Sequence, residues 1–231
     1  MKTLSEYRAE ARQALKGKWG TSALFVFVYA VVALIINGVT SIPVPGMEAI
    51  TTGASLLGML IILPLAYGMT VGFLGQLRGR ELEVGQIFSG YNRRVWVTEI
   101  VKFLYIILWG IPAIIIAIVL FTGGAMAGMD LDTLMPIGIF VTLVAMIPMY
   151  IKTYAYSMVE YLLADNPELS NREALRESER ITNGHKMRLF LLDLSFIGWT
   201  LLGILTLFIG LLWVGAYQYT ARAAYYEDIK D

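Results

Sequence analysis

The chain has 231 residues, of which 57% are hydrophobic and 16% are charged, and its formal net charge is zero. Average soluble domains are about 45–50% apolar and about 25% charged, so this chain is rich in apolar side chains and poor in charge. The balanced charge gives no basis for a nucleic-acid partner. The absence of cysteine excludes disulfides, thiolate metal sites and thiol nucleophiles.

The apolar side chains are collected into runs of about 20 residues or more, the length that crosses about 30 Å of hydrocarbon. A soluble helical protein would instead alternate apolar and polar faces along each helix. The composition therefore predicts an all-α, polytopic membrane protein. We expect residues 1–231 to form a single membrane domain.

Residues 3–18 are predicted to form a basic amphipathic helix ahead of the first membrane span. The segment opens with Thr3-x-x-Glu6, the spacing of a capping box, and its apolar positions then recur at helical spacing among arginines and lysines. Helices of this kind lie in a membrane interface. The first span is expected at 21–39 and the second at 54–77, joined by a loop rich in proline and glycine. Acidic residues make the first segment unlike a cleavable signal, so we expect the first span to remain as an anchor.

A second short amphipathic helix is predicted at 84–91, where four apolar side chains recur at i, i+3, i+4 and i+7. The third span is expected at 97–121. The fourth is expected as one continuous helix over 134–163 that includes Pro148. Proline inside a span is tolerated where neighbouring helices satisfy the carbonyl that it frees.

A third amphipathic helix is predicted to begin at a second capping box, Ser170-x-x-Glu173, and to end at a glycine cap, Gly184. The apolar run that follows is too long for one untilted crossing. We therefore expect a tight turn at 206–210 that separates the fifth span from a sixth, which ends near Glu227. The prediction is six transmembrane helices in three hairpins, with short cytoplasmic amphipathic helices before the first, third and fifth.

The basic residues predict the orientation of these spans. All 18 Lys and Arg fall in the N-terminal segment, the loops after the second and fourth spans, the C-terminal tail, or the halves of the spans that adjoin these segments. None lies in the three opposite loops. Cytoplasmic loops carry an excess of Lys and Arg, so both termini are expected in the cytoplasm.

The order of amphipathic helix, span, short loop and span occurs three times, which suggests repeats at 1–77, 78–165 and 166–231. Parallel repeats would place a pseudo-symmetry axis along the membrane normal, with the second helix of each hairpin, here called the return helix, facing inward. The return helices carry tyrosines, namely Tyr67, Tyr150, Tyr154, Tyr217 and Tyr219. The alternative is that every six-span protein alternates in this way and that tyrosines are typical of membrane interfaces.

The stretches "NPELSNREALRESERITNGHK", "LDLSFIGW" and "AYYEDI", together with "ALKGKWG" near the start, resemble a bacterial integral-membrane family catalogued as domain of unknown function 975. This resemblance implies a multi-pass protein of the bacterial cytoplasmic membrane and no established activity. The chain departs from the family pattern at Ala216, where a proline usually precedes tyrosine, and at Met149, where a glycine usually follows the proline.

Six charged side chains lie inside or at the edge of the predicted spans, all in their cytoplasmic halves. They are Glu99, Lys102, Lys152, Glu160, Asp193 and Arg222. Each charge at the centre of a bilayer costs at least about 2.5–3.5 kcal/mol, so these groups are expected to pair or to reach water. Asp193 and Arg222 are expected at similar depth and are candidates for one pair.

Three interpretations of the six charges remain open. They form a structural network between hairpins, or a polar vestibule that is open to the cytoplasm and receives a ligand or lipid headgroup, or a proton relay. The relay is the least favoured, since no acid lies near mid-membrane. The single histidine, His185, cannot make a zinc site, and the Ser and Thr residues of the spans have no base within helical reach. We expect no catalytic residue, no metal and no cofactor.

The sequence therefore favours a non-enzymatic membrane protein that binds or helps to translocate a lipid or small amphiphile. The alternative is a scaffold, immunity-type or transporter-accessory protein that acts through helix–helix contacts, and a membrane enzyme comes third. Membrane lipids are the expected partners. The basic amphipathic helices are either surface anchors or docking sites for a membrane or cytosolic protein or an anionic lipid.

Overall fold

The computed structural model describes residues 1–43 and 46–230, and every regular element in them is a helix. The predicted all-α class is therefore confirmed for the part of the chain that is described. The elements in chain order are α1 (Leu4–Leu15), α2 (Trp19–Thr40), α3 (Glu48–Leu77), η1 (Val84–Gly90), α4 (Arg93–Met126), α5 (Leu131–Ala145), α6 (Ile147–Ala155), α7 (Val159–Asp165), α8 (Asn171–Thr182), α9 (Lys186–Leu194), α10 (Ile197–Leu205) and α11 (Leu211–Ile229).

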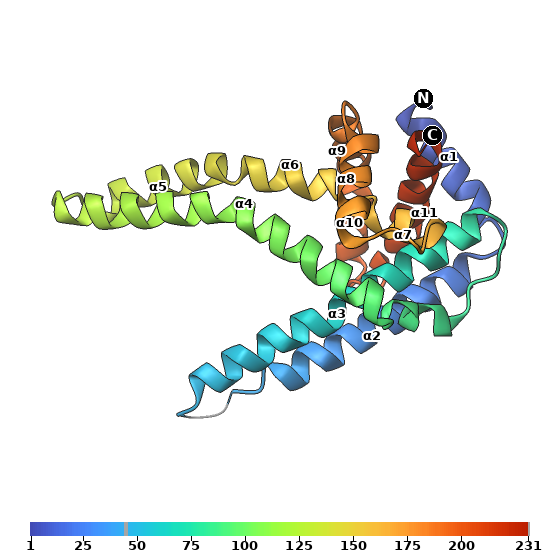
Figure 1. The fold of residues 1–231 in the computed structure, drawn as a ribbon, viewed down its shortest axis with the longest axis horizontal. Helices are drawn as coiled ribbons and strands as arrows, with labels where there is room; N and C mark the ends of the chain where they lie inside the picture. Colours follow the sequence, from blue (N-terminus) through green and yellow to red (C-terminus); the bar gives the residue numbers. More distant parts are fainter. Residues whose placement is uncertain (44–45, 231) are drawn as a thin grey trace.

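Two long helical hairpins project in different directions from a common base (Figure 1). One consists of α2 and α3, and the other of α4 with α5 and α6. Their outer parts expose apolar side chains such as Leu34 and Met126, which are 71% and 90% exposed. The predicted loop between the first two spans contains residues 44–45, which lie outside the described residues.

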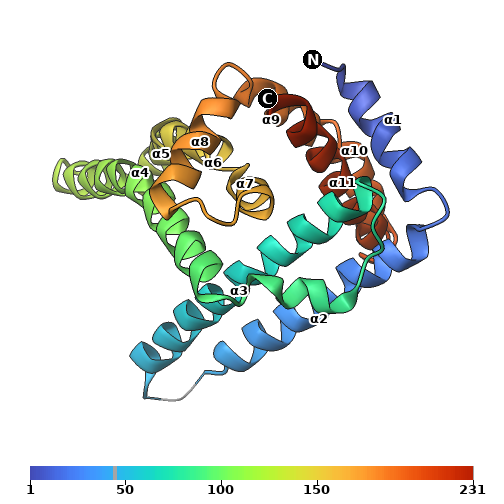
Figure 2. The same cartoon turned by 45° about the vertical axis from the view of Figure 1, so that its right-hand side comes forward.

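The base is built around α11, the last helix of the chain, with α1, α2 and α3 packed against it (Figure 2). Its second half is almost entirely buried, and Tyr225 and Tyr226 are at most 1% exposed. The ring of Tyr226 stacks on Tyr161 of α7, with 4.9 Å between centroids. The side chains of α11 therefore meet other helices over much of its length.

Within the described residues, five helical stretches are long and apolar enough to cross a membrane: Trp19–Thr40, Glu48–Leu77, Arg93–Met126, Leu131–Asp165 and Lys186–Leu205. These agree with the first five predicted spans. The sixth predicted span corresponds to α11. Among the described helices, α11 does not reach the hydropathy of these five stretches. Its neighbours are protein helices on several sides, so small and polar residues such as Thr220 and Ala221 replace the aliphatic residues that lipid contact would require.

Both predicted capping boxes are confirmed. The Thr3 hydroxyl accepts a hydrogen bond from the Glu6 N–H, and Ser170 does the same with Glu173. α1 and α8 each have 12 residues and are each followed by a left-handed glycine, Gly17 in one case and Gly184 in the other. These two segments therefore correspond closely, although the threefold repeat as a whole stays a prediction.

The apolar faces of α1 and α8 differ from expectation in what they contact. Tyr7, Ala11 and Leu15 of α1 are fully buried, and Ala174 and Ser178 of α8 are also fully buried. Because these side chains pack on other helices, they are not free to enter a lipid interface. The second predicted amphipathic helix, at 84–91, is the 3₁₀ helix η1 and not an α-helix.

η1 crosses α3 at a close approach between backbones. A Cβ built on Gly68 of α3 would lie 2.1 Å from the Ile87 carbonyl oxygen, and one on Gly90 would lie 2.1 Å from that of Pro64. Neither position has room for a side chain without movement of the backbone. Glycine at both positions therefore lets η1 lie directly on α3.

The fourth predicted span is not one continuous helix. It breaks at Met146, just before Pro148, whose ring and missing N–H disrupt the preceding turn. It breaks again at 156–158, where Ser178 of α8 enters the helical hydrogen-bond ladder. The Ser178 hydroxyl donates to the Ala155 carbonyl at 2.7 Å and accepts from the Met158 N–H at 3.2 Å. A side chain that inserts in this way is a recognised cause of kinks.

Arg78 joins the ends of the three return helices. It is the C-terminal cap of α3, and its guanidinium binds Asp165 of α7 through two hydrogen bonds of 2.5 and 2.7 Å. Its Nε also donates to Glu227 of α11 at 2.6 Å. One side chain therefore holds three helices that are distant in sequence.

We expect Arg78→Ala to lower the free energy of unfolding by about 2 kcal/mol, since hydrogen bonds to charged groups contribute about 1.5–3 kcal/mol and the site is partly exposed. The measurement is thermal unfolding of the protein in detergent. Arg80→Ala is the matched control, because Arg80 lies two residues away and takes no part in the ion pairs of Arg78 with Asp165 and Glu227. Equal midpoints for the two variants would contradict the role assigned to Arg78.

Candidate functional site

A cavity of about 360 Å³ lies where the two projecting hairpins meet α11. Its wall combines tyrosines, small residues and three of the charged residues singled out in the sequence. The lining residues are Ala66 and Thr70 of α3, Lys102 and Ile106 of α4, Tyr150, Thr153 and Tyr154 of α6, Tyr156 and Ser157 of the break, Glu160 and Tyr161 of α7, and Tyr219 and Arg222 of α11. We call this cavity the vestibule.

The segment before and within the break supplies much of the wall. Tyr150, Thr153, Tyr154 and Ser157 follow the spacing i, i+3, i+4 and i+7, which places them on one face of a helix. After the break, α7 brings Glu160 to the same cavity. The break that Ser178 stabilises therefore lies within the wall of the vestibule.

Lys102 lies between two carboxylates at the edge of the vestibule. Its Nζ is 2.6 Å from Glu99 Oε2 and also forms an ion pair with Glu160 of α7. The Lys102 and Glu160 side chains are each 13% exposed, whereas that of Glu99 is 1% exposed. Glu99 therefore lies behind the wall and Glu160 at its surface.

Arg222 is held on the opposite side by Asp193 of α9. Its Nε donates to Asp193 Oδ1 at 2.8 Å and its Nη2 donates to Oδ2 at 2.6 Å, a bidentate geometry. Gln218, one turn earlier on α11, donates to Asp193 Oδ1 at 3.3 Å. This pair links the fifth predicted span to α11 and fixes the guanidinium at the cavity wall.

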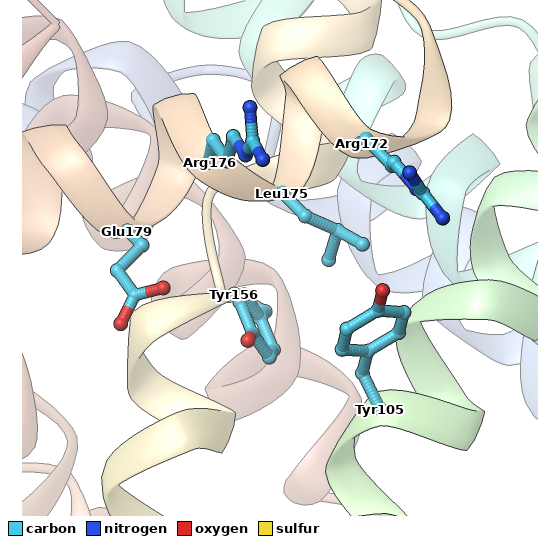
Figure 3. A pocket seen from close by; sticks show the side chains of 6 residues that line it. All are labelled: Tyr105, Tyr156, Arg172, Leu175, Arg176 and Glu179. Atoms are coloured by element: carbon cyan, nitrogen blue, oxygen red, sulfur yellow. The ribbon is translucent and has the colours of Figure 1, made fainter.

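Lys152 does not line the vestibule, although its Nζ lies 5.7 Å from the ring centroid of Tyr156, which does. Its Nζ pairs with Glu179 of α8 at 2.6 Å and lies 5.1 Å from the centroid of Trp109. Glu179 borders a second cavity of about 330 Å³, lined by Tyr105, Tyr156, Arg172, Leu175, Arg176 and Glu179 (Figure 3). Because Lys152 does not share the helix face of Tyr150 and Tyr154, it points to α8 instead.

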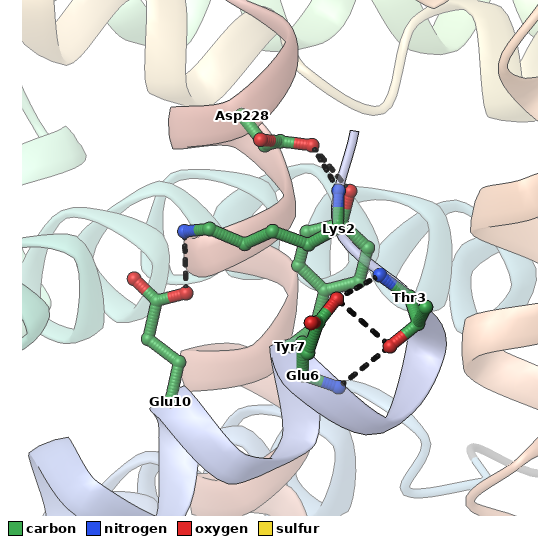
Figure 4. A network of polar contacts seen from close by, with 6 residues as sticks. All are labelled: Lys2, Thr3, Glu6, Tyr7, Glu10 and Asp228. Atoms are coloured by element: carbon green, nitrogen blue, oxygen red, sulfur yellow. Dashed lines mark hydrogen bonds and ion pairs between the residues drawn. The ribbon is translucent and has the colours of Figure 1, made fainter.

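A further polar network fixes the end of α11 against α1 (Figure 4). Asp228 accepts hydrogen bonds from the Tyr7 hydroxyl at 2.6 Å and from the Lys2 N–H at 3.0 Å. Burial, and then the hydrogen bond to the Asp228 carboxylate, raise the pKa of Tyr7. In the adjacent capping box, hydrogen bonds from the Thr3 N–H and hydroxyl lower the pKa of Glu6. These hydrogen bonds therefore hold the C-terminal end of α11 against the N-terminal helix.

The sequence identified the charged groups of the vestibule but not most of its wall. Tyr156, Tyr161 and Thr70 were not singled out. The four-residue spacing of Tyr150 and Tyr154 does indicate that these two side chains lie on one face of a helix. Glu179, the partner of Lys152, carries no local signal. Among the described residues, no three His, Asp or Glu side chains are grouped as they would be around a metal ion.

The apolar surface of the projecting hairpins indicates a membrane protein, and the part of the chain that the structure describes has five helices long and apolar enough to span a bilayer. A family described as "Protein of unknown function (DUF975)" matches residues 1–231. The chain belongs to this family, as the resemblance implied. Comparison with curated proteins and with solved structures gave no match.

The Asp193–Arg222 pair can be tested by a double-mutant cycle. Asp193→Asn or Arg222→Gln alone leaves a charge without its partner, which we expect to lower the free energy of unfolding by about 1–3 kcal/mol. The double variant is expected to recover most of this loss. Strictly additive losses, measured by denaturant unfolding in the same detergent, would show that the two charges do not act as a pair.

Proposed function

We propose that the protein binds a lipid or another small amphiphile, with the polar headgroup in the vestibule and the chain along the apolar surfaces of the hairpins. The observation that carries this proposal is the composition of the cavity wall. Lys102, Glu160 and Arg222 offer charges of both signs, while tyrosine rings and Ile106 supply apolar surface. Binding sites of this type are mostly apolar with a few well-placed polar groups.

The size of the cavity supports a headgroup and not a whole two-chain lipid. Ligand cavities generally measure about 300–1,000 Å³, and the 360 Å³ of the vestibule is at the small end of that range. The acyl chains would therefore lie outside it, against exposed side chains such as Tyr150 and Ile107. Lys102 and Arg222 suit a phosphate group and Glu160 suits an ammonium group, so a zwitterionic headgroup is the best fit.

The membrane arrangement that accompanies this proposal is six spans in three hairpins, with α11 as the sixth. Its 19 residues rise about 28 Å, close to the thickness of the hydrocarbon layer. The positions of the Lys and Arg residues favour termini in the cytoplasm, and the family resemblance favours the bacterial cytoplasmic membrane. On this arrangement the vestibule lies in the cytoplasmic half, and α1 and α8 lie at the cytoplasmic surface.

Cysteine labelling tests this topology without background, because the chain has no cysteine of its own. We expect Met126→Cys and Leu205→Cys, at the exposed turns of two hairpins, to react with an impermeant maleimide in intact cells. Lys16→Cys and Arg180→Cys should react only after permeabilisation. Labelling of Lys16→Cys and Met126→Cys from the same side would contradict the proposed arrangement.

The binding proposal is tested with a variant that blocks the vestibule. Thr153 is exposed at its rim, so Thr153→Trp should fill the mouth without disturbing the core. We expect at least a tenfold weaker affinity for a single-chain phospholipid with a fluorescent acyl chain, since about 1.4 kcal/mol of lost binding energy corresponds to a factor of ten.

The matched control is Ile151→Trp, two residues away, which is 49% exposed and does not line the vestibule. Its affinity should equal that of the unmodified protein. Equal affinities for all three proteins, measured by fluorescence in nanodiscs, would favour the alternative of a scaffold that acts through its exposed apolar hairpins. We propose no enzymatic activity for the vestibule.

A further inference from the structure

The group of Glu99, Lys102 and Glu160 contains one positive side chain and two carboxyl groups. Lys102 contacts both carboxyl groups, Glu99 on its own helix and Glu160 on α7. With all three ionised, the group has a net charge of −1. A charge that is buried away from water is costly unless it is paired and hydrogen-bonded.

Glu99 has an oxygen that makes no hydrogen bond. Oε2 contacts Lys102, but Oε1 is enclosed and has no hydrogen-bond partner among the described residues. The side chain is 1% exposed, so bulk water does not reach it. An ionised carboxylate accepts several hydrogen bonds, and a buried acceptor without a partner costs about 1–3 kcal/mol, or more when charged.

The other charges around the group are already engaged. Arg222, across the vestibule, is bound to Asp193, and Lys152 is bound to Glu179. Three tyrosines lie near the group: Tyr67 of α3 near both carboxyl groups, and Tyr161 and Tyr219 near Glu160. Their phenol groups are neutral at ordinary pH. Among the residues that the structure describes, no second cation pairs with this group to balance the second carboxylate.

We propose that the Glu99 carboxyl is a proton-binding site, which holds its proton on Oε1 while Lys102 and Glu160 remain an ion pair at the vestibule wall. Glu99 carries the proton because Glu160 faces the cavity, where water can solvate its charge. A metal cation fits the group less well, since the Lys102 ammonium already occupies the position between the two carboxyl groups.

The proton site has a consequence for ligand binding in the vestibule. This consequence rests on the proposed function. An anionic group that binds Lys102 draws the ammonium away from both carboxyl groups, and the proton on Glu99 is then held more tightly. Because coupling between two sites is reciprocal, lower pH would favour the binding of such a group. The proton site itself does not depend on this consequence.

Infrared spectroscopy of the protein in lipid, at neutral pH and without added amphiphile, tests the site directly. We expect a carbonyl band of a protonated carboxylic acid that shifts in D₂O and disappears in Glu99→Gln. Glu179→Gln is the matched control, because Glu179 also pairs with a lysine but is 40% exposed; it should keep the band. Absence of the band in the unmodified protein, or its persistence in Glu99→Gln, would overturn the proposal.

A second variant decides the question if Glu99→Gln does not fold. The carbonyl band should remain but shift in frequency in Glu99→Asp, which keeps a carboxyl group at the site beside Lys102. A band at unchanged frequency in that variant would assign the proton to another carboxyl group and overturn the proposal. Since no amphiphile is added, a negative result here leaves the phospholipid-binding test unaffected, and a failure of that test leaves the proton site unaffected.

Discussion

The bidentate contact between Arg78 and Asp165, extended to Glu227, is the constraint on which the rest of the structure depends. It joins the ends of α3, α7 and α11, which are far apart in the sequence and would otherwise be held mainly by apolar packing. The same three helices form much of the vestibule wall. Arginine suits this position because its planar fork can bind two carboxylates at once, which a lysine cannot do with the same geometry.

The two projecting hairpins and the base follow different physical rules. The hairpins expose leucine, isoleucine and valine over most of their surface, which is favourable in a hydrocarbon solvent. The base is stabilised as a soluble protein is, by a buried core that includes Tyr7, Phe73 and Tyr225. α11 belongs to both regions, because it corresponds to the sixth predicted span and its second half lies at the centre of the core. Its modest hydropathy reflects its protein neighbours.

The charged groups of the vestibule are arranged in unequal sets. The positive charge of Arg222 is balanced by one carboxylate, that of Asp193. The positive charge of Lys102 is shared between two carboxyl groups, those of Glu99 and Glu160. Buried ion pairs seldom add stability beyond what apolar residues of equal volume would provide, because desolvation of both charges opposes their attraction. Their presence at one cavity is the observation on which the proposed binding of a polar headgroup rests.

Local sequence determined the features that depend on neighbouring residues alone. Runs of apolar side chains predicted six spans, and five of these match helical stretches of the described residues that are long and apolar enough to cross a membrane. Both capping boxes follow from the three-residue spacing of Thr3 with Glu6 and of Ser170 with Glu173. Hydropathy and caps act within one helix, so they can be recognised in one dimension.

Only the tertiary structure decided how the charges are distributed and where the helices break. Lys152 was grouped with the vestibule residues but pairs with Glu179, because the direction of a side chain depends on the rotation of its helix against its neighbours. The break at 156–158 depends on Ser178, 20 residues further along the chain. Hydrophobic patterning fixes which segments enter the membrane, whereas contacts between segments distant in sequence fix which polar groups meet.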